Sequence, residues 1–162
     1  MVLISKEERI KKLTEYVVNH QEKLYRLTYS YVHHEQTSLD IIQDAIVKAL
    51  DKIMTLKQEE YMTTWFYRIL INECLKKVKK KEVQEFSIEE YELADKKEIE
   101  EIETYEIIQK LKPKLRTVII LRFFEQMKIE EIAKITNTNI NTVKSRLYKA
   151  LNELKLEMKE KE

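Results

Sequence analysis

The residues best suited to chemistry in this 162-residue sequence are amide, hydroxyl and cationic side chains near its C-terminal end. Between residues 141 and 149 they alternate with apolar residues at helical spacing. Such groups can bond to phosphates and to base edges in the major groove of DNA, so the pattern is typical of a recognition helix. The face predicted to be exposed carries Asn141, Thr142, Lys144, Ser145, Arg146, Tyr148 and Lys149.

A helix-turn-helix is the motif that this spacing predicts around those residues. Residues 136–139 predict a polar turn in which Asn137 takes the left-handed conformation, and Asn139 or Asn141 is expected to cap the second helix. The competing interpretation is a helical hairpin whose charged face is simply solvated. The apolar residues of the two helices are Ile129, Ile132, Ala133 and Ile135, then Val143, Leu147, Ala150, Leu151 and Leu154.

Helical spacing also runs through the N-terminal half of the chain, where apolar residues recur three and four positions apart. They are Leu24, Leu27 and Tyr31, then Ile42, Ala45, Ala49 and Ile53, then Trp65, Phe66, Ile69 and Leu70. Pro113 suits the first turn of a later helix, which is expected to run on to Phe123 and Phe124. With no glycine for phosphate loops or tight hairpins, the sequence predicts an all-α fold.

The charge of the chain is unevenly distributed, although the formal net charge is only +1. Residues 1–81 carry 15 basic and 11 acidic residues, residues 82–104 carry 2 and 10, and residues 105–162 carry 13 and 8. Two basic blocks therefore flank an acidic stretch that lacks a sustained apolar stripe, as a linker does. The sequence predicts two small helical domains, 1–81 and 105–162, joined by an acidic linker over 82–104.

Catalytic and metal-binding sites are not predicted, so no cofactor and no enzymatic activity are expected. Cys74 is the single cysteine, His33 and His34 are adjacent and cannot share a helix face, and His20 has no partner at a ligand spacing. The longest apolar runs fall short of a membrane span, and residues 1–12 lack the apolar core of a signal peptide. The expectation is a cytoplasmic protein with no direct membrane insertion.

Three segments resemble a known family, the extracytoplasmic-function (ECF) sigma factors of the sigma-70 family. Residues 142–150 (TVKSRLYKA) resemble the recognition helix of its region 4. Residues 39–45 (LDIIQDA) resemble the region 2 helix that docks on RNA polymerase, and residues 64–72 (TWFYRILIN) resemble the −10 element helix. Residues 120–125 (ILRFFE) are further similar to sigma-V-like members, which respond to envelope stress.

The resemblance implies a protein that binds core RNA polymerase, recognises promoter −35 and −10 elements and opens the duplex. Domain 1–81 would be region 2, and domain 105–162 would be region 4. Core binding would fall on Asp40, Gln43 and Asp44, which share a helix face. The −35 element would be read by the seven residues between 141 and 149 named above, with lysine at positions where arginine is frequent in the family.

Binding and melting of the −10 element would fall on the end of the first block. Residues 57–64 would form the loop that holds a base flipped from the non-template strand, with Tyr61 and Trp65 as nearby aromatic residues. Trp65 also fits the apolar stripe and is expected to belong mainly to the core. The residues implied to bind −10 DNA are Tyr61, Trp65, Arg68, Asn72, Lys76, Lys79 and Lys80.

The resemblance also implies partners: core RNA polymerase, promoter DNA and a cognate anti-sigma factor, a type of regulator that is often membrane-anchored. The chain would then be held at the membrane through that regulator. The alternative function is a helix-turn-helix regulator that binds palindromes as a dimer and is no polymerase subunit. A sensor or dimerisation domain has no reason to carry the motifs at 39–45 and 64–72, and these favour the sigma factor.

Overall fold

The computed structural model describes residues 5–83 and 106–160, and within these ranges it describes side chains except at 80–83 and 157–160. The described residues form helices and turns with no strand, which confirms the all-α prediction. The chain divides into two compact units, Met1–Lys77 and Val78–Glu162. The linker predicted over 82–104 lies, from residue 84 on, outside the described residues.

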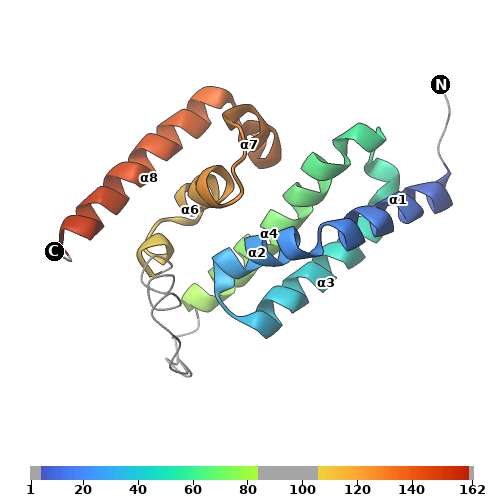
Figure 1. The fold of residues 1–162 in the computed structure, drawn as a ribbon, viewed down its shortest axis with the longest axis horizontal. Helices are drawn as coiled ribbons and strands as arrows, with labels where there is room; N and C mark the ends of the chain where they lie inside the picture. Colours follow the sequence, from blue (N-terminus) through green and yellow to red (C-terminus); the bar gives the residue numbers. More distant parts are fainter. Residues whose placement is uncertain (1–4, 84–105, 161–162) are drawn as a thin grey trace. The chain divides into compact units, whose positions relative to one another are not determined.

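The first unit is built from four α-helices with two short 3₁₀ turns before the last of them (Figure 1). In chain order they are α1 (Lys6–Asn19), α2 (Gln21–Val32), α3 (Glu35–Asp51), η1 (Ile53–Thr55), η2 (Glu59–Tyr61) and α4 (Met62–Val83). Helix α2 packs against α3, and α1 packs against α2 and η1. The short connections favour antiparallel neighbours, as in other helical bundles.

The core of the first unit contains the predicted residues Leu24, Leu27 and Tyr31 of α2, all fully buried. On α3 the predicted Ala45 and Ala49 are fully buried, and Ile53 just after the helix is buried as well, whereas the prediction was wrong at Ile42. Ile41 is fully buried and Ile42 only partly, because the buried stripe runs through Ser38, Ile41, Ala45 and Ala49 at spacings of three and four. Several apolar residues of α3 that lie outside this stripe face water.

The second unit includes the last turns of α4, after which the described residues resume with a helical stretch at 106–109. There follow α6 (Pro113–Ile119), the π-helical η3 (Ile120–Phe124), α7 (Ile129–Thr136) and α8 (Ile140–Glu160). Both α6 and α7 pack on α8. Pro113 occupies the first turn of α6, as predicted.

The helix that begins at Pro113 does not run on regularly to Phe123 and Phe124. The amide of Glu125 donates to the carbonyl of Ile120 at 3.0 Å, which closes a wide π turn. Gln126 then takes a positive φ of 54° and ends the helix. The extra residue in this turn shifts the helical register, and both phenylalanine side chains are exposed.

The turn of the helix-turn-helix forms without glycine. Asn137 is left-handed, with φ 55° and ψ 45°, and closes α7 as predicted. Of the two predicted caps, Asn139 is the one that acts: its Oδ1 accepts from the amide of Thr142 at 2.7 Å. This bond satisfies one of the free N–H groups at the start of α8 and fixes where the helix begins.

Replacing Asn139 with alanine removes the cap acceptor from α8. We expect the free energy of unfolding to fall by about 1 kcal/mol, since a lost N-cap typically costs this much. Chemical denaturation of the full chain, followed by circular dichroism, measures the change. Asn141→Ala is the matched control because Asn141 is exposed and makes no cap, and its expected effect is within about 0.5 kcal/mol. Equal losses in the two variants would contradict the assignment of the cap.

Candidate nucleic-acid interface

Helix α8 presents a polar face opposite a narrow apolar stripe. Val143, Leu147 and Ala150 are buried, and they anchor the helix on the rest of the second unit. The predicted residues that are exposed are Asn141, Lys144, Ser145, Tyr148 and Lys149. Tyr148 is 74% exposed, which is unusual for so large a side chain in a helix that packs on its own unit.

Three predicted positions on α8 differ from expectation. Thr142 and Arg146 are only half-exposed, because both lie on the flank of the helix rather than at the centre of its open face. Leu151, expected in the core, is 42% exposed, since position 151 falls beyond the edge of the stripe that Val143 and Leu147 define. Fewer polar residues are therefore fully exposed on α8 than the sequence predicted, and the exposed face has an apolar residue, Leu151, at its edge.

Helix α4 brings most of the predicted −10 residues together on one face. Trp65, Arg68, Asn72, Lys76 and Lys79 follow one another at spacings of three and four, so at 100° per residue they fall within an arc of about 80°. All are exposed except Trp65, which is half-buried, so the expectation that it belongs mainly to the core is met only in part.

The opposite side of α4 holds this face in place. Phe66, Leu70 and Cys74 are fully buried there, so the helix cannot rotate without exposing them. Lys80 continues the helix, but its side chain lies outside the described residues. The predicted −10 surface is therefore one continuous polar and cationic stripe along α4 as far as Lys79.

The segment before α4 forms a short exposed loop between two buried anchors. Leu56 and Met62 are buried, and residues 57–61 between them are exposed, including Tyr61. The indole Nε1 of Trp65 donates to Oγ1 of Thr55 at 3.2 Å and ties the start of α4 to the residue before the loop. A loop anchored at both ends presents its side chains in a limited set of positions.

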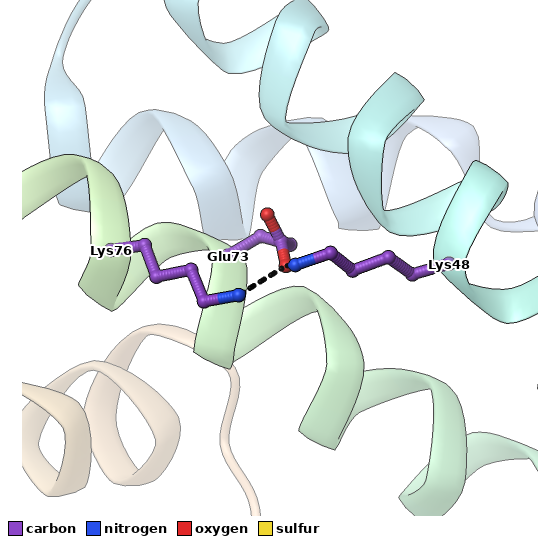
Figure 2. A network of polar contacts seen from close by, with 3 residues as sticks. All are labelled: Lys48, Glu73 and Lys76. Carbon is purple, nitrogen blue, oxygen red and sulfur yellow. Dashed lines mark hydrogen bonds and ion pairs between the residues drawn. The ribbon is translucent and has the colours of Figure 1, made fainter.

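An ion-pair network links α3 to the cationic face of α4 (Figure 2). The carboxylate of Glu73 is buried, and it binds the ammonium groups of Lys48 from α3 and of Lys76, the latter at 3.5 Å. The hydrogen bond to Glu73 raises the pKa of Lys48, since the carboxylate favours the charged ammonium. Sequence reasoning missed Glu73, although its three-residue spacing from Lys76 was a usable signal.

The predicted polymerase-binding residues share a face of α3. Gln43 and Asp44 are exposed, and Asp40 is half-buried and accepts a hydrogen bond from Nε2 of Gln36 at 3.0 Å. Apolar side chains interleave with them, a feature that the sequence prediction did not include. These exposed apolar residues of α3 are Leu39, Val47 and Leu50.

No group of three or more metal-ligating side chains occurs among the described residues. Cys74 is fully buried, and burial raises the pKa of its thiol, so it stays protonated and unreactive. No helix in the described part of the chain is long and apolar enough to cross a membrane. The exposed groups on α8, α4 and α3 are hydrogen-bonding, cationic and apolar side chains, which suit binding to DNA and protein.

Comparison with known proteins agrees with this chemistry. The chain matches the family models for sigma-70 region 2 over residues 16–83 and for sigma-70 region 4 over residues 102–154. It is 38% identical over 146 residues to RNA polymerase sigma factor SigV of Bacillus subtilis, covering 88% of each chain. It is 26% identical to the ECF RNA polymerase sigma factor SigW of the same organism, covering 87% of this chain and 86% of SigW.

A solved structure of CnrH in complex with the cytosolic domain of CnrY shares the fold, with a TM-score of 0.72 and 19% identity over 93% of this chain and 89% of that one. The match to region 2 also explains the N-terminal block, which a dimeric helix-turn-helix regulator would not carry. Both sigma-70 regions and the close similarity to SigV over most of its length show that the chain belongs to the ECF sigma factors of the sigma-70 family.

Proposed function

We propose that this sigma factor divides its work among three helix faces: α3 for core RNA polymerase, α4 for the −10 element and α8 for the −35 element. The observation that carries the proposal is the pair of polar, cationic faces on α4 and α8, each held by a buried apolar stripe on the other side of its helix. Two DNA-binding faces in two units suit recognition of two separated promoter elements. RNA synthesis itself is left to the polymerase, and this chain acts as an initiation factor.

Helix α8 supports major-groove binding because its exposed groups can satisfy both phosphates and base edges. Asn141 and Ser145 offer hydrogen-bonding groups, and Lys144 and Lys149 offer charge. Tyr148 stands out from the middle of this face, where its ring can contact a thymine methyl or a sugar. Arg146, on the flank, is better placed for the DNA backbone than for a base.

Helix α4 supports binding of the melted −10 region. Arg68, Lys76 and Lys79 supply phosphate contacts, and Asn72 interrupts them with an amide that can read a base edge. Extruding a base costs a few kcal/mol of unstacking, which a pocket can offset by stacking and edge contacts. Tyr61, exposed in the loop before α4, is the aromatic side chain available for such stacking.

The α3 face supports docking on a protein. Exposed Leu39, Val47 and Leu50 lie among Gln43 and Asp44, and an apolar patch bounded by polar groups is typical of a protein interaction site. We assign this face to core polymerase, with the acidic groups pairing with basic groups of the polymerase.

A second partner of the α3 face is an anti-sigma factor. The structural neighbours include CnrH with the cytosolic domain of CnrY and the sigma factor RpoE of Bartonella quintana with the anti-sigma factor NepR. We propose that a cognate, membrane-anchored anti-sigma factor holds this chain in the cytoplasm until an envelope stress releases it. An anti-sigma factor that covers α3 would keep the chain from polymerase.

Reconstitution with core polymerase and a promoter library tests the proposed function as a whole. We expect transcription from a subset of promoters that share two elements at fixed spacing. Tight binding to a palindrome without transcription would instead favour a regulator that acts outside the polymerase.

Reversing the charge of Asp44 tests the polymerase surface. We expect Asp44→Lys to weaken core binding at least about tenfold, roughly 1.4 kcal/mol, because like charges would face each other in the interface. Titration of labelled core polymerase measures the affinity, and circular dichroism verifies the fold. Glu15→Lys, an exposed reversal on α1, is the control and should bind normally. Normal binding by Asp44→Lys would remove Asp44 from the surface.

Removing Lys144 distinguishes base readout from phosphate binding on α8. Loss of a base contact should cost about 1–3 kcal/mol and relax the preference at one base pair, whereas loss of a phosphate contact weakens all sequences alike. We expect Lys144→Ala to relax the preference at one −35 position. Footprinting on promoters with single −35 substitutions measures it, and a uniform loss across all of them would contradict base readout.

Removing lysines from α4 tests the electrostatic part of −10 binding. Each phosphate contact contributes about one unit to the slope of log affinity against log salt. We expect Lys76→Ala and Lys79→Ala each to lower that slope by about one for holoenzyme on −10 DNA. Lys11→Ala on α1 is the control, since Lys11 is exposed away from α4. An unchanged slope in both α4 variants would show that this stripe does not contact DNA.

A further inference from the structure

Helix α1 lies in register beside the chain segment that leads into α4. The guanidinium of Arg9 donates to the main-chain carbonyl of Leu56, and the ammonium of Lys12 pairs with the carboxylate of Glu59. One turn further on, the hydroxyl of Tyr16 shares a hydrogen bond with the side chain of Thr63. The partners in the two polar contacts are 47 positions apart in the sequence, as Tyr16 and Thr63 are, so the two segments run in parallel over this length.

The spacing of these residues explains the register. Positions 9, 12 and 16 share one face of α1, because residues three and four apart are neighbours on a helix. Leu13 beside them is 1% exposed and anchors that face in the core. The ring of Tyr16 also meets that of Phe66 edge-on, with centroids 5.9 Å apart, so the contact continues into the first turns of α4.

These contacts fall on the loop that carries Tyr61. The Arg9 bond holds the buried anchor at Leu56, and the Lys12 pair holds the middle of the exposed stretch at Glu59. The bond from Trp65 to Thr55 closes the loop from its other side. Residues 57–61 are therefore held at both ends and in the middle, although their own side chains are exposed.

The contacts differ in expected strength. Arg9 is partly buried and makes a charge-assisted bond to a backbone oxygen, so it fixes the path of the main chain whatever side chain stands at position 56. Lys12 and Glu59 remain 34% and 53% exposed, and pairs this accessible contribute little to stability. The effect of the Lys12 pair should therefore appear in loop position rather than in folding.

We propose that α1 is a brace for the −10 loop, with Arg9 and Lys12 as positioning residues that hold residues 57–61 ready to receive an unpaired base of promoter DNA. This rests on the proposed function, in which the loop binds the flipped base. A preorganised loop binds its ligand without the cost of ordering itself at that moment. Neither residue need touch DNA, since both act through the loop.

Promoter opening by the full chain with core polymerase tests the brace. A fluorescent base analogue at the −10 position reports the flipped base, and separate titrations report core affinity and −35 binding. We expect Arg9→Ala to lower open-complex formation about tenfold and to flatten the preference among −10 bases, with the other two affinities unchanged. Arg9→Lys, which keeps a charged donor, should recover part of the loss, and Lys11→Ala should behave as wild type.

A charge exchange provides a test that does not depend on the stability of Arg9→Ala. Lys12→Glu places two like charges together and should slow opening about two- to threefold, while Lys12→Glu combined with Glu59→Lys should open faster than Lys12→Glu alone because the ion pair is re-formed. Normal opening and normal −10 preference in a folded Arg9→Ala protein would overturn the brace. The brace would also be overturned if the double variant opened promoters as slowly as Lys12→Glu. The same holds if Arg9→Ala lost core affinity by as large a factor as it lost open-complex formation. A wild-type chain that opens no promoter would instead refute the proposed function itself.

Discussion

The burial of one apolar stripe on each helix is the constraint on which the rest of this structure depends. Burying a leucine- or phenylalanine-sized side chain stabilises the fold by about 1.5–3 kcal/mol, so turning α4 to hide its lysines would expose Phe66 and Leu70 at a cost of several kcal/mol. Each ion pair of an exposed lysine stabilises the fold by far less, typically about 0–1 kcal/mol. The position of every side chain on the polar faces of α4 and α8 that we propose to bind DNA is thus set by residues on the opposite side of the same helix. The polar faces therefore point toward solvent because exposing the apolar faces instead would cost too much free energy.

Polar contacts then fix the positions of helices and loops more closely than burial of the apolar stripes alone. Glu73 is buried between two lysines from different helices, so α3 and α4 share one network in the first unit (Figure 2). A buried carboxylate needs such partners, since leaving it unpaired would cost far more than the pair gains. In a similar way, the contacts of α1 with Leu56 and Glu59 join that helix to the loop before α4. In the second unit, Asn137 and Asn139 shape the turn of a helix-turn-helix in a chain with no glycine at all.

Much of this could be predicted from the sequence where the signal is local. The positions of the helix start at Pro113, the left-handed turn at Asn137 and the cap at Asn139 all follow from local side-chain chemistry. The stripe from Trp65 to Lys79 follows from spacing along one helix. The errors have physical causes. Ala45 and Ala49 were predicted correctly on α3, but with apolar residues at both 41 and 42, spacing alone does not say which of the two is buried. The helix from Pro113 was expected to run on regularly to Phe124, but residues 120–124 form a π turn that helical spacing does not indicate. The contacts of Arg9 with Leu56 and of Glu73 with Lys48 join distant segments, and no local pattern reveals them.

Site-specific crosslinking in the promoter complex tests most directly whether the packed faces of α4 and α8 assign the two promoter elements. A photoreactive residue would replace Asn72 on α4 in one variant and Tyr148 on α8 in another, each in the full chain bound to core polymerase. We predict that position 72 crosslinks to the −10 region and position 148 to the −35 region, both more efficiently than a probe at exposed Glu15. Crosslinks to the opposite elements, or no more crosslinking than at position 15, would contradict the account.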